Sequence, residues 1–237
     1  MSTTRTSPAS FLKHAVEVAS FYGFRSMRDI ERELLRDLDT KPAGRRGQAV
    51  YSFESAAALA AARAAARPQE PVLGFYATPV PAHVPPGVSA RDVGEFGLQV
   101  VGTQESVGEI VLLKTITMVA NEWGSPLSRV RVNALGDRDS QQRFARELGA
   151  YLRRHLDQFD EGVRKGLMEN PFSAYKLDTP AAKEVLEGGP RPMHFLSEKS
   201  RVHFRSVLEH LEQLGLPYEL DDLLGGDERG PHIAFAL

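Results

Sequence analysis

The chain has 237 residues, of which 25% are charged, and a formal net charge of −2. This length can bury a sizeable core, and the near-neutral charge creates no overall field that would attract nucleic acid. The absence of cysteine excludes disulfides and thiolate metal sites, and no apolar run approaches the roughly 20 residues that span a bilayer. We therefore expect a cytoplasmic protein that binds neither membranes nor DNA.

The N-terminal part of the chain predicts helices alternating with short strands. Residues 8–22 carry apolar side chains at helical spacing, Gly23 ends this helix, and "FRSM" follows as a strand. The segment "RDIERELLRDL" contains no helix breaker and is expected to be a helix. After a loop, the alternating "AVYSF" predicts a strand and "AAALAAARAAAR" predicts an alanine-rich helix.

The middle of the chain contains a proline-rich loop. Four prolines lie between Pro79 and Pro86 inside the segment "PVLGFYATPVPAHVPPGVSARDVGEFGLQVVG", which favours a stiff, extended backbone there. A helix follows and ends at Gly124. The segment "RVRVNAL" then predicts another strand.

Helix boundaries are well marked in the C-terminal half. A residue before proline is disfavoured in the α region, and small polar residues cap the first turn of a helix. Helix ends are accordingly predicted at Asp137 or Asp139, Asn170-Pro171, Thr179-Pro180, Gly188-Gly189 and Ser197. The long helix that begins near Asp137 is expected to run to Gln158, and "PYEL" is expected to leave the last helix as a strand.

Five landmarks follow one another at near-constant spacing: "NALGD", "NPFSAYKLDT", "GPRPM", "SRVHF" and "GLPYEL". Their order resembles the region of histidyl-tRNA synthetases between class II motif 2 and the histidine-specific motif. The resemblance implies an α+β fold, with a mostly antiparallel sheet of the class II aminoacyl-tRNA synthetase kind flanked by helices. It also implies a single core over residues 1–237, with a helical insertion at about residues 137–214.

The resemblance extends to two candidate substrate-binding residues. Glu54 coincides with the acidic residue that accepts the amino group of histidine in the family, although an acid there also suits the first turn of a helix. Arg91 falls on the family's R-E-F segment, where it is either a ligand contact or a surface residue. "FYGFRSMRDIERE" resembles motif 1, which builds the dimer interface in the family, so a homodimer or hetero-oligomer is implied.

Several positions depart from the family pattern. Pro81 stands where the family has the motif 2 arginine, which stabilises negative charge on the α-phosphate during adenylate formation. His83 and Gln99 replace two glutamates, Gly225 replaces the histidine-specific arginine, and Arg229-Gly230 replace the paired tyrosines. Gly226 and Phe235 match the family, but neither motif 3 nor an anticodon-binding domain is found.

These departures predict a histidyl-tRNA synthetase-like protein that no longer makes an adenylate and acts as a binding or regulatory partner. In this hypothesis it has no catalytic residues, no metal, no cofactor, and no tRNA as a partner. An alternative is a histidine–tRNA ligase, or a split fragment of one, that uses ATP and magnesium. A folded remnant that binds nothing is a third possibility.

Overall fold

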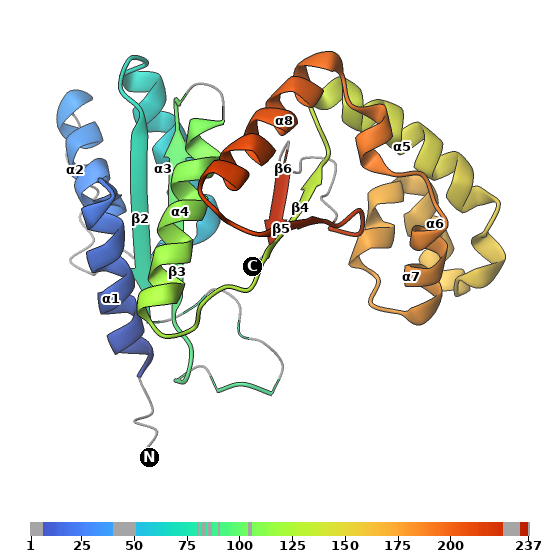
Figure 1. The fold of residues 1–237 in the computed structure, drawn as a ribbon, viewed down its shortest axis with the longest axis horizontal. Helices are drawn as coiled ribbons and strands as arrows, with labels where there is room; N and C mark the ends of the chain where they lie inside the picture. The colour runs from blue at the N-terminus through green and yellow to red at the C-terminus, as the bar shows by residue number, and fades with distance from the viewer. Residues whose placement is uncertain are drawn as a thin grey trace. The chain divides into compact units, whose positions relative to one another are not determined.

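The computed structural model describes residues 7–39, 51–79, 81, 84, 87–89, 91–103, 106–224 and 233–236. The chain forms two compact units, Met1–Pro126 and Leu127–Leu237, each with its own small sheet and helices (Figure 1). None of the described helices is long and apolar enough to cross a membrane.

The N-terminal unit is built on a three-stranded sheet in the order β1-β2-β3. Strand β1 pairs in parallel with β2, whereas β2 and β3 form a seven-residue antiparallel pair. The elements of this unit are α1 (Pro8–Phe21), β1 (Arg25–Ser26), α2 (Met27–Asp37), α3 (Phe53–Ala66), β2 (Val72–Thr78), β3 (Glu95–Val101) and α4 (Val107–Glu122).

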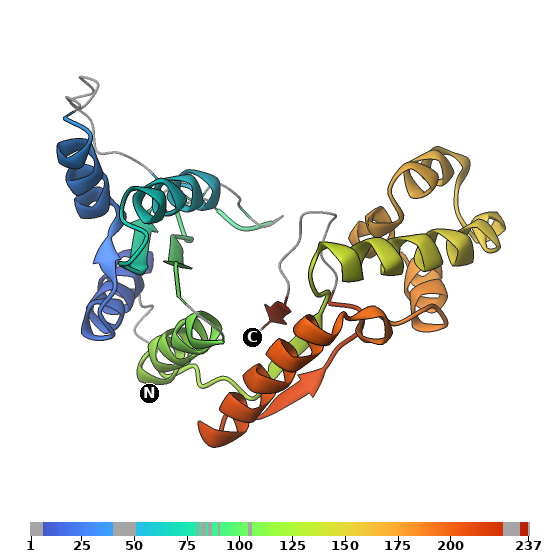
Figure 2. The ribbon, with the colours of Figure 1, turned by 90° about the horizontal axis from the view of Figure 1, so that it is seen from above.

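The helices of the N-terminal unit cover the two faces of this sheet in pairs (Figure 2). Helices α1 and α4 pack on one face, where Phe75, Phe96 and Leu98 lie in an apolar cluster with Ala19 and Phe24. Helices α2 and α3 pack on the other face, with cluster members Met27, Ile30, Ala56, Ala60, Val72 and Tyr76. Because successive strand residues point to opposite faces, the same two strands serve both layers.

Most predicted elements of this unit are confirmed, but the strand predicted at "AVYSF" is wrong where the structure describes it. Ser52 is the N-cap of α3 and Phe53 is its first residue. The Ser52 side chain accepts a hydrogen bond from the backbone N–H of Ser55 at 3.3 Å, and the Ser55 hydroxyl accepts one from the Ser52 N–H at 2.9 Å. This capping box outweighs the alternating pattern. Residues 49 and 50 lie outside the described part of the chain.

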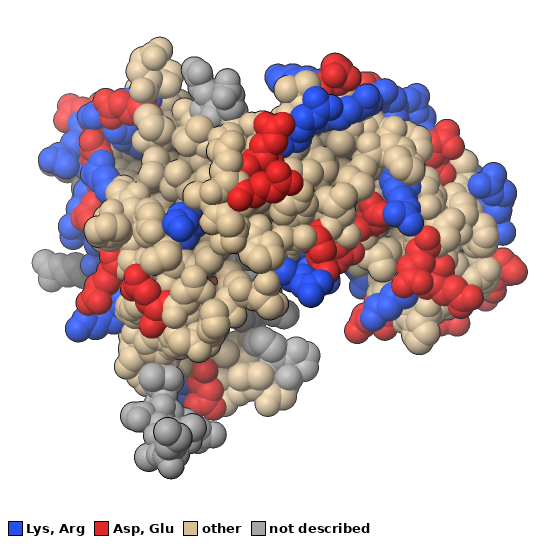
Figure 3. Space-filling model, viewed as in Figure 1, with Lys and Arg blue, Asp and Glu red and all other residues tan. Residues whose placement is uncertain are grey.

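Charged side chains of both signs are interspersed on the visible face of each unit (Figure 3). In the N-terminal unit, three arginines and three acids form one network across α2, α3 and β1. Arg63 is buried and contacts Glu70 at 2.7 Å, while Arg67 contacts Asp37 at 2.7 Å and Arg25 contacts Glu33 at 2.8 Å. The network ties the ends of the two helices to the sheet edge.

The C-terminal unit contains a second three-stranded sheet in the order β5-β4-β6, in which β4 pairs in parallel with β5 and antiparallel with β6. Short 3-10 helices join its α-helices. The elements are β4 (Val130–Ala134), α5 (Arg138–Arg153), η1 (Leu156–Gln158), α6 (Glu161–Glu169), η2 (Pro171–Lys176), α7 (Pro180–Glu187), η3 (Pro192–Phe195), α8 (Glu198–Gln213), β5 (Tyr218–Leu220) and β6 (Ile233–Ala236).

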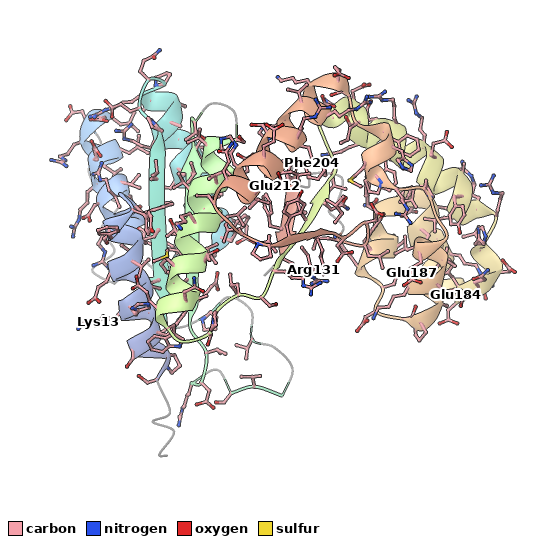
Figure 4. The ribbon with its side chains drawn as sticks, viewed as in Figure 1. Lys13, Arg131, Glu184, Glu187, Phe204 and Glu212 are labelled. Atoms are coloured by element: carbon pink, nitrogen blue, oxygen red, sulfur yellow. The ribbon has the colours of Figure 1, made fainter. Side chains whose placement is uncertain are left out.

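The predicted helix boundaries of this unit are confirmed with one change. Asn170 ends α6, and Thr179 caps α7, in which Pro180 is the first residue. Helix α5 ends at Arg153 rather than Gln158, because the backbone tightens there into η1. Phe204 extends from α8 (Figure 4) and is buried in the core of the unit.

The N-termini of α5 and α8 meet at a hydrogen-bonded cluster of one aspartate and three serines. Asp137 Oδ1 accepts from the Ser140 N–H at 2.9 Å, and Asp137 Oδ2 accepts from the Ser197 hydroxyl at 2.6 Å. The Asp137 N–H in turn donates to Ser200 Oγ at 3.0 Å. The hydrogen bonds from Ser197 and Ser140 hold the pKa of Asp137 well below its usual range.

Gly136 brings this cluster together, because its φ of 73° is in the left-handed region. A Cβ at this position would lie 2.6 Å from Ser140 Cβ, so only glycine fits. The landmarks "NALGD" and "SRVHF" are therefore in direct contact, because Asp137 ends the first and Ser200 begins the second. The described elements confirm the predicted α+β class, whereas the prediction of a single core with a helical insertion stays a prediction.

Candidate functional site

One face of the β2–β3 pair carries polar and small residues in an unusual combination. The register places Gly74 opposite Gln99, Tyr76 opposite Gly97, and Thr78 opposite Glu95. Directly opposite residues share a face, and so do residues two apart along a strand. These six residues therefore form one surface, here called the polar face, on the side of the sheet that packs against α2 and α3.

Tyr76 lies at the centre of the polar face and is only 5% exposed. Its ring lies directly on Gly97, because a Cβ at Gly97 would overlap the Cε1 and Cζ atoms of Tyr76. Its hydroxyl donates a hydrogen bond to Glu95 Oε1 at 2.7 Å. Burial, this hydrogen bond, and the charges of Glu95 and Glu54 together raise the pKa of Tyr76 well above its ordinary value.

Gln99 adds a hydrogen-bond donor that is not used within the described part of the chain. Its Nε2 atom is buried, and no described residue accepts a hydrogen bond from it. A buried donor without a partner costs about 1–3 kcal/mol, so such groups are rare and often mark functional positions. The polar face thus offers a carboxylate, a phenol and an amide, and none of its six residues is Lys or Arg.

Glu54 lies in the first turn of α3 and is exposed. Its carboxylate accepts a hydrogen bond from the Ser52 hydroxyl at 2.8 Å. A hydrogen bond from its own backbone N–H, followed by that of Ser52, lowers its pKa. This geometry suits a first-turn acid. The contribution of Glu54 to the pKa of Tyr76 also places its charge near the polar face, so both interpretations of Glu54 stay open.

Arg91 lies in the connection before β3 and is exposed. Its backbone N–H donates to Ser89 Oγ at 3.3 Å. No hydrogen bond or ion pair joins its guanidinium to the polar face among the residues that the structure describes. Of the two candidates from the sequence, Glu54 is thus near the polar face electrostatically, while Arg91 is not linked to it.

The remaining positions of interest are only partly described. Pro81 lies in the connection between β2 and β3, outside any helix or strand, and Phe235 lies in β6. His83, Gly225, Gly226, Arg229 and Gly230 lie outside the described residues. No group of three or more His, Asp or Glu side chains that could hold a metal ion is found in the described ranges.

The sequence analysis missed Tyr76 and Glu95. The segments "GFYAT" and "EFGLQ" each place a small or polar residue at every second position, which is the period of a strand. Pairing the two segments in an antiparallel hairpin would have brought Tyr76, Gly97 and Glu95 together, but the register of a long hairpin is not readable from the residues alone.

Comparison with known proteins relates the chain to one family of curated relatives. The histidine–tRNA ligase of Halorhodospira halophila is 32% identical over 151 residues, 63% of this chain and 36% of that protein. That of Chlorobium phaeovibrioides is 30% identical over 148 residues, 62% of this chain and 35% of that protein. The match spans about a third of the length of these relatives. No protein-family model matches the chain.

A solved structure agrees in fold. The crystal structure of apo histidyl-tRNA synthetase from S. aureus matches with a TM-score of 0.62 at 20% identity, covering 95% of this chain and 55% of that one. The match confirms the predicted fold class.

Proposed function

Starting from the premise that the chain has a histidyl-tRNA synthetase-like class II core, we propose that it no longer activates an amino acid and serves as a binding or regulatory partner. Amino-acid activation places negative charge on the α-phosphate of ATP, and a positioned guanidinium or metal ion stabilises that charge. The observation that carries the proposal is the make-up of the polar face, which has a carboxylate at Glu95 and no cationic side chain.

Pro81 supports this proposal. At the position of the family's motif 2 arginine, proline has no side-chain donor and also lacks a backbone N–H. Arg91 is the nearest cationic residue described in this connection, and no interaction among the described residues links its guanidinium to the polar face. Among its six residues, the polar face has one carboxylate and no cationic side chain, a composition that does not favour a phosphate.

The same proposal assigns partners and location. We infer a homodimer or a hetero-oligomer in the cytoplasm, without a bound cofactor and without tRNA or DNA as a ligand. The mixed surface charge supports the last point, because nucleic-acid affinity comes mainly from cationic contacts to phosphates.

A second candidate function is histidine–tRNA ligase activity, in this chain or in a split enzyme to which it belongs. The observation that favours it is the retention of Glu54 at the family's acidic position, beside the polar face. In this case ATP and magnesium would be needed, with cationic groups supplied from outside the described residues.

The decisive experiment is ATP–pyrophosphate exchange with histidine and magnesium, using the purified full chain. We expect no exchange above a protein-free blank, whereas the Halorhodospira halophila relative, assayed in parallel as a positive control, should exchange. Histidine-dependent exchange by this chain, abolished by Glu54→Gln, would refute the proposal and establish the ligase function. Size-exclusion chromatography with light scattering tests the oligomeric state separately.

A further inference from the structure

The C-terminal unit contains a helical part with an apolar core of its own. Residues 138–196, here called the helical lobe, comprise α5, α6 and α7 with the 3-10 helices η1, η2 and η3 (Figure 1). The buried members of one apolar cluster run from Phe144 to Val185, and the half-buried side chains packed against them run from Ala145 to Phe195. The buried side chains that the structure describes in β4 and α8 are not members of this cluster. The lobe is therefore held together by its own residues.

The chain enters and leaves the helical lobe at neighbouring points. Asp137 is the N-cap of α5, and Ser197 is the N-cap of α8. The Ser197 hydroxyl donates to Asp137 Oδ2 at 2.6 Å, and the Ser197 N–H donates to Ser140 Oγ at 2.8 Å. The Asp137 N–H donates to Ser200 Oγ at 3.0 Å. Hydrogen bonds thus join the two connections side by side.

The helical lobe also meets the strands of its unit at η3. This short helix contacts β4, and Arg191 just before it pairs with Asp222 at 2.8 Å. The Arg191 side chain is 59% exposed, and an ion pair of an exposed group adds little stability. Boundaries between parts that move separately fall where little packing crosses and where the connections can absorb a rotation. The paired connections beside Gly136, which has left-handed backbone, meet both conditions.

We propose that the helical lobe pivots as a folded body about these two connections, and that Asp137 is the latch that holds it closed. The carboxylate accepts from both sides of the hinge, at Oδ1 from the Ser140 N–H and at Oδ2 from the Ser197 hydroxyl. It loses one of these partners when the N-termini of α5 and α8 separate. Its negative charge also lies at two helix N-termini, each of which favours an anion. This inference goes beyond the proposed function and does not depend on it.

The first test measures a distance across the hinge in the full chain. The sequence contains no cysteine, so Lys165→Cys in α6 and Glu209→Cys in α8, both exposed positions, can be spin-labelled without competing sites. We expect double electron–electron resonance to give one narrow distance distribution for this labelled chain. Adding Asp137→Ala should produce a second distance and raise the ratio of open to closed lobes at least about tenfold, because charge-assisted hydrogen bonds are lost.

Hydrogen exchange separates a latch from an ordinary cap. If the helical lobe pivots as a folded body, Asp137→Ala should speed amide exchange at least about tenfold in the first turns of α5 and α8. Exchange in α6 and α7 should stay at the wild-type rate, because the apolar cluster inside the lobe remains intact. Equal acceleration throughout α6, α7 and β4 would show that the whole unit opens together, and would overturn the proposal.

The matched control is Thr179→Ala, which removes a cap inside the helical lobe. Thr179 accepts from the Ala182 N–H at 3.2 Å at the start of α7 and does not cross the hinge. This variant should leave the distance between the labels unchanged. A second distance of equal population in Thr179→Ala and Asp137→Ala would mean that the loss of any cap loosens the unit, and the proposal would be wrong.

A second variant covers the case in which Asp137→Ala does not fold. Ser197→Ala breaks the same link from the side of α8 and keeps the Asp137 cap of α5. It should also produce the second distance. The proposal is overturned if the folded variants keep the single wild-type distance, and equally if neither variant folds, because the lobe is then not separable from the rest of its unit.

Discussion

The two faces of the β2–β3 pair differ in kind: one carries large apolar side chains, and the other carries the polar groups and glycines of the candidate site. Towards α1 and α4, the strands present Phe75, Phe96 and Leu98, which fill the space without polar groups. Towards α2 and α3, the polar face has glycine on both strands and places one tyrosine among a carboxylate and an amide.

The two faces should differ in how much a substitution lowers the free energy of unfolding. Large apolar side chains stabilise a sheet by burial, so their truncation is expensive wherever they lie. Glycines and polar groups contribute little to burial, and their presence in the middle of strands weakens the sheet. The polar face retains them despite this cost, which is why we take it as the candidate site.

The largest effect is expected on the apolar face, at Phe75. Phe75→Ala should lower the free energy of unfolding of the N-terminal unit by about 3–5 kcal/mol, because the cavity left between the sheet and α1 cannot fully collapse. Equilibrium urea unfolding, followed by circular dichroism, measures the change. A loss below about 1 kcal/mol would show that the apolar face is loosely packed, and the contrast between the two faces would fail.

A smaller effect is expected at Gly97, where the Tyr76 ring occupies the place that a side chain would take. Gly97→Ala should destabilise the chain by about 1–3 kcal/mol, because the new Cβ displaces the Tyr76 ring and breaks its hydrogen bond to Glu95. In a Tyr76→Ala background the same substitution should cost little, since the ring is no longer there. Urea unfolding of the four proteins in this cycle gives the coupling between the two sites.

Gly166 provides the control for that cycle, since a Cβ there meets no atom within 4 Å. Gly166→Ala in α6 should be neutral or stabilising in both backgrounds, because alanine favours the helix. An unchanged cost of Gly97→Ala in the absence of Tyr76 would mean that the clash is with the backbone, and the assignment of the ring to Gly97 would be wrong.

The hydroxyl of Tyr76 is expected to contribute less than its ring. Tyr76→Phe should lower the free energy of unfolding by about 1 kcal/mol at neutral pH, the usual net value of one hydrogen bond. The phenol pKa is raised in the folded protein above its ordinary value of 10.0, so folding favours the protonated form. This stabilisation is fully present below pH 10 and is lost as pH rises through the higher folded pKa.

The wild-type chain should therefore lose stability more steeply above pH 10 than Tyr76→Phe, and the difference between them should shrink. Unfolding curves at several pH values, with absorbance at the tyrosinate band as a second readout, check the sign. Parallel pH profiles for the two proteins would show that burial and Glu95 do not raise the pKa of Tyr76 in solution.

Local chemistry explains which parts of the fold were predictable. The ends of α6, α7 and α8 were predicted correctly because Asn170, Thr179 and Ser197 act on the backbone within a few residues of themselves. The strand predicted at "AVYSF" failed for the same reason, since Ser52 and Ser55 form a capping box that the alternation of apolar residues concealed.

The candidate site was predictable only where a residue could be matched to a family motif, as Glu54 could. Tyr76 and Glu95 are separated by 19 positions, and their contact depends on the register of the β2–β3 pair. Period-two alternation places each residue on a face, but it does not say which residues oppose one another across a connection of this length. Contacts set by long-range register had to come from the structure.

The smallest effect that we predict separates Glu54 from Arg91. Glu54→Gln should lower the pKa of Tyr76 in the folded chain, because Glu54 is the last of the contributions that raise it, after burial and the two from Glu95. The decrease should be smaller than that caused by Glu95→Gln, and Arg91→Ala should cause none, since nothing links Arg91 to the polar face in the described structure. Spectrophotometric titration of the tyrosines, with Tyr76→Phe subtracted to isolate the one phenol, resolves the three variants.

If Glu54→Gln and Arg91→Ala leave the titration equally unchanged, Glu54 is only a first-turn acid of α3, and its charge does not belong to the polar face. A decrease in the order Glu95→Gln, Glu54→Gln, Arg91→Ala would place Glu54 at the margin of that face, where an ammonium group held at Glu95 would also be within reach of its charge.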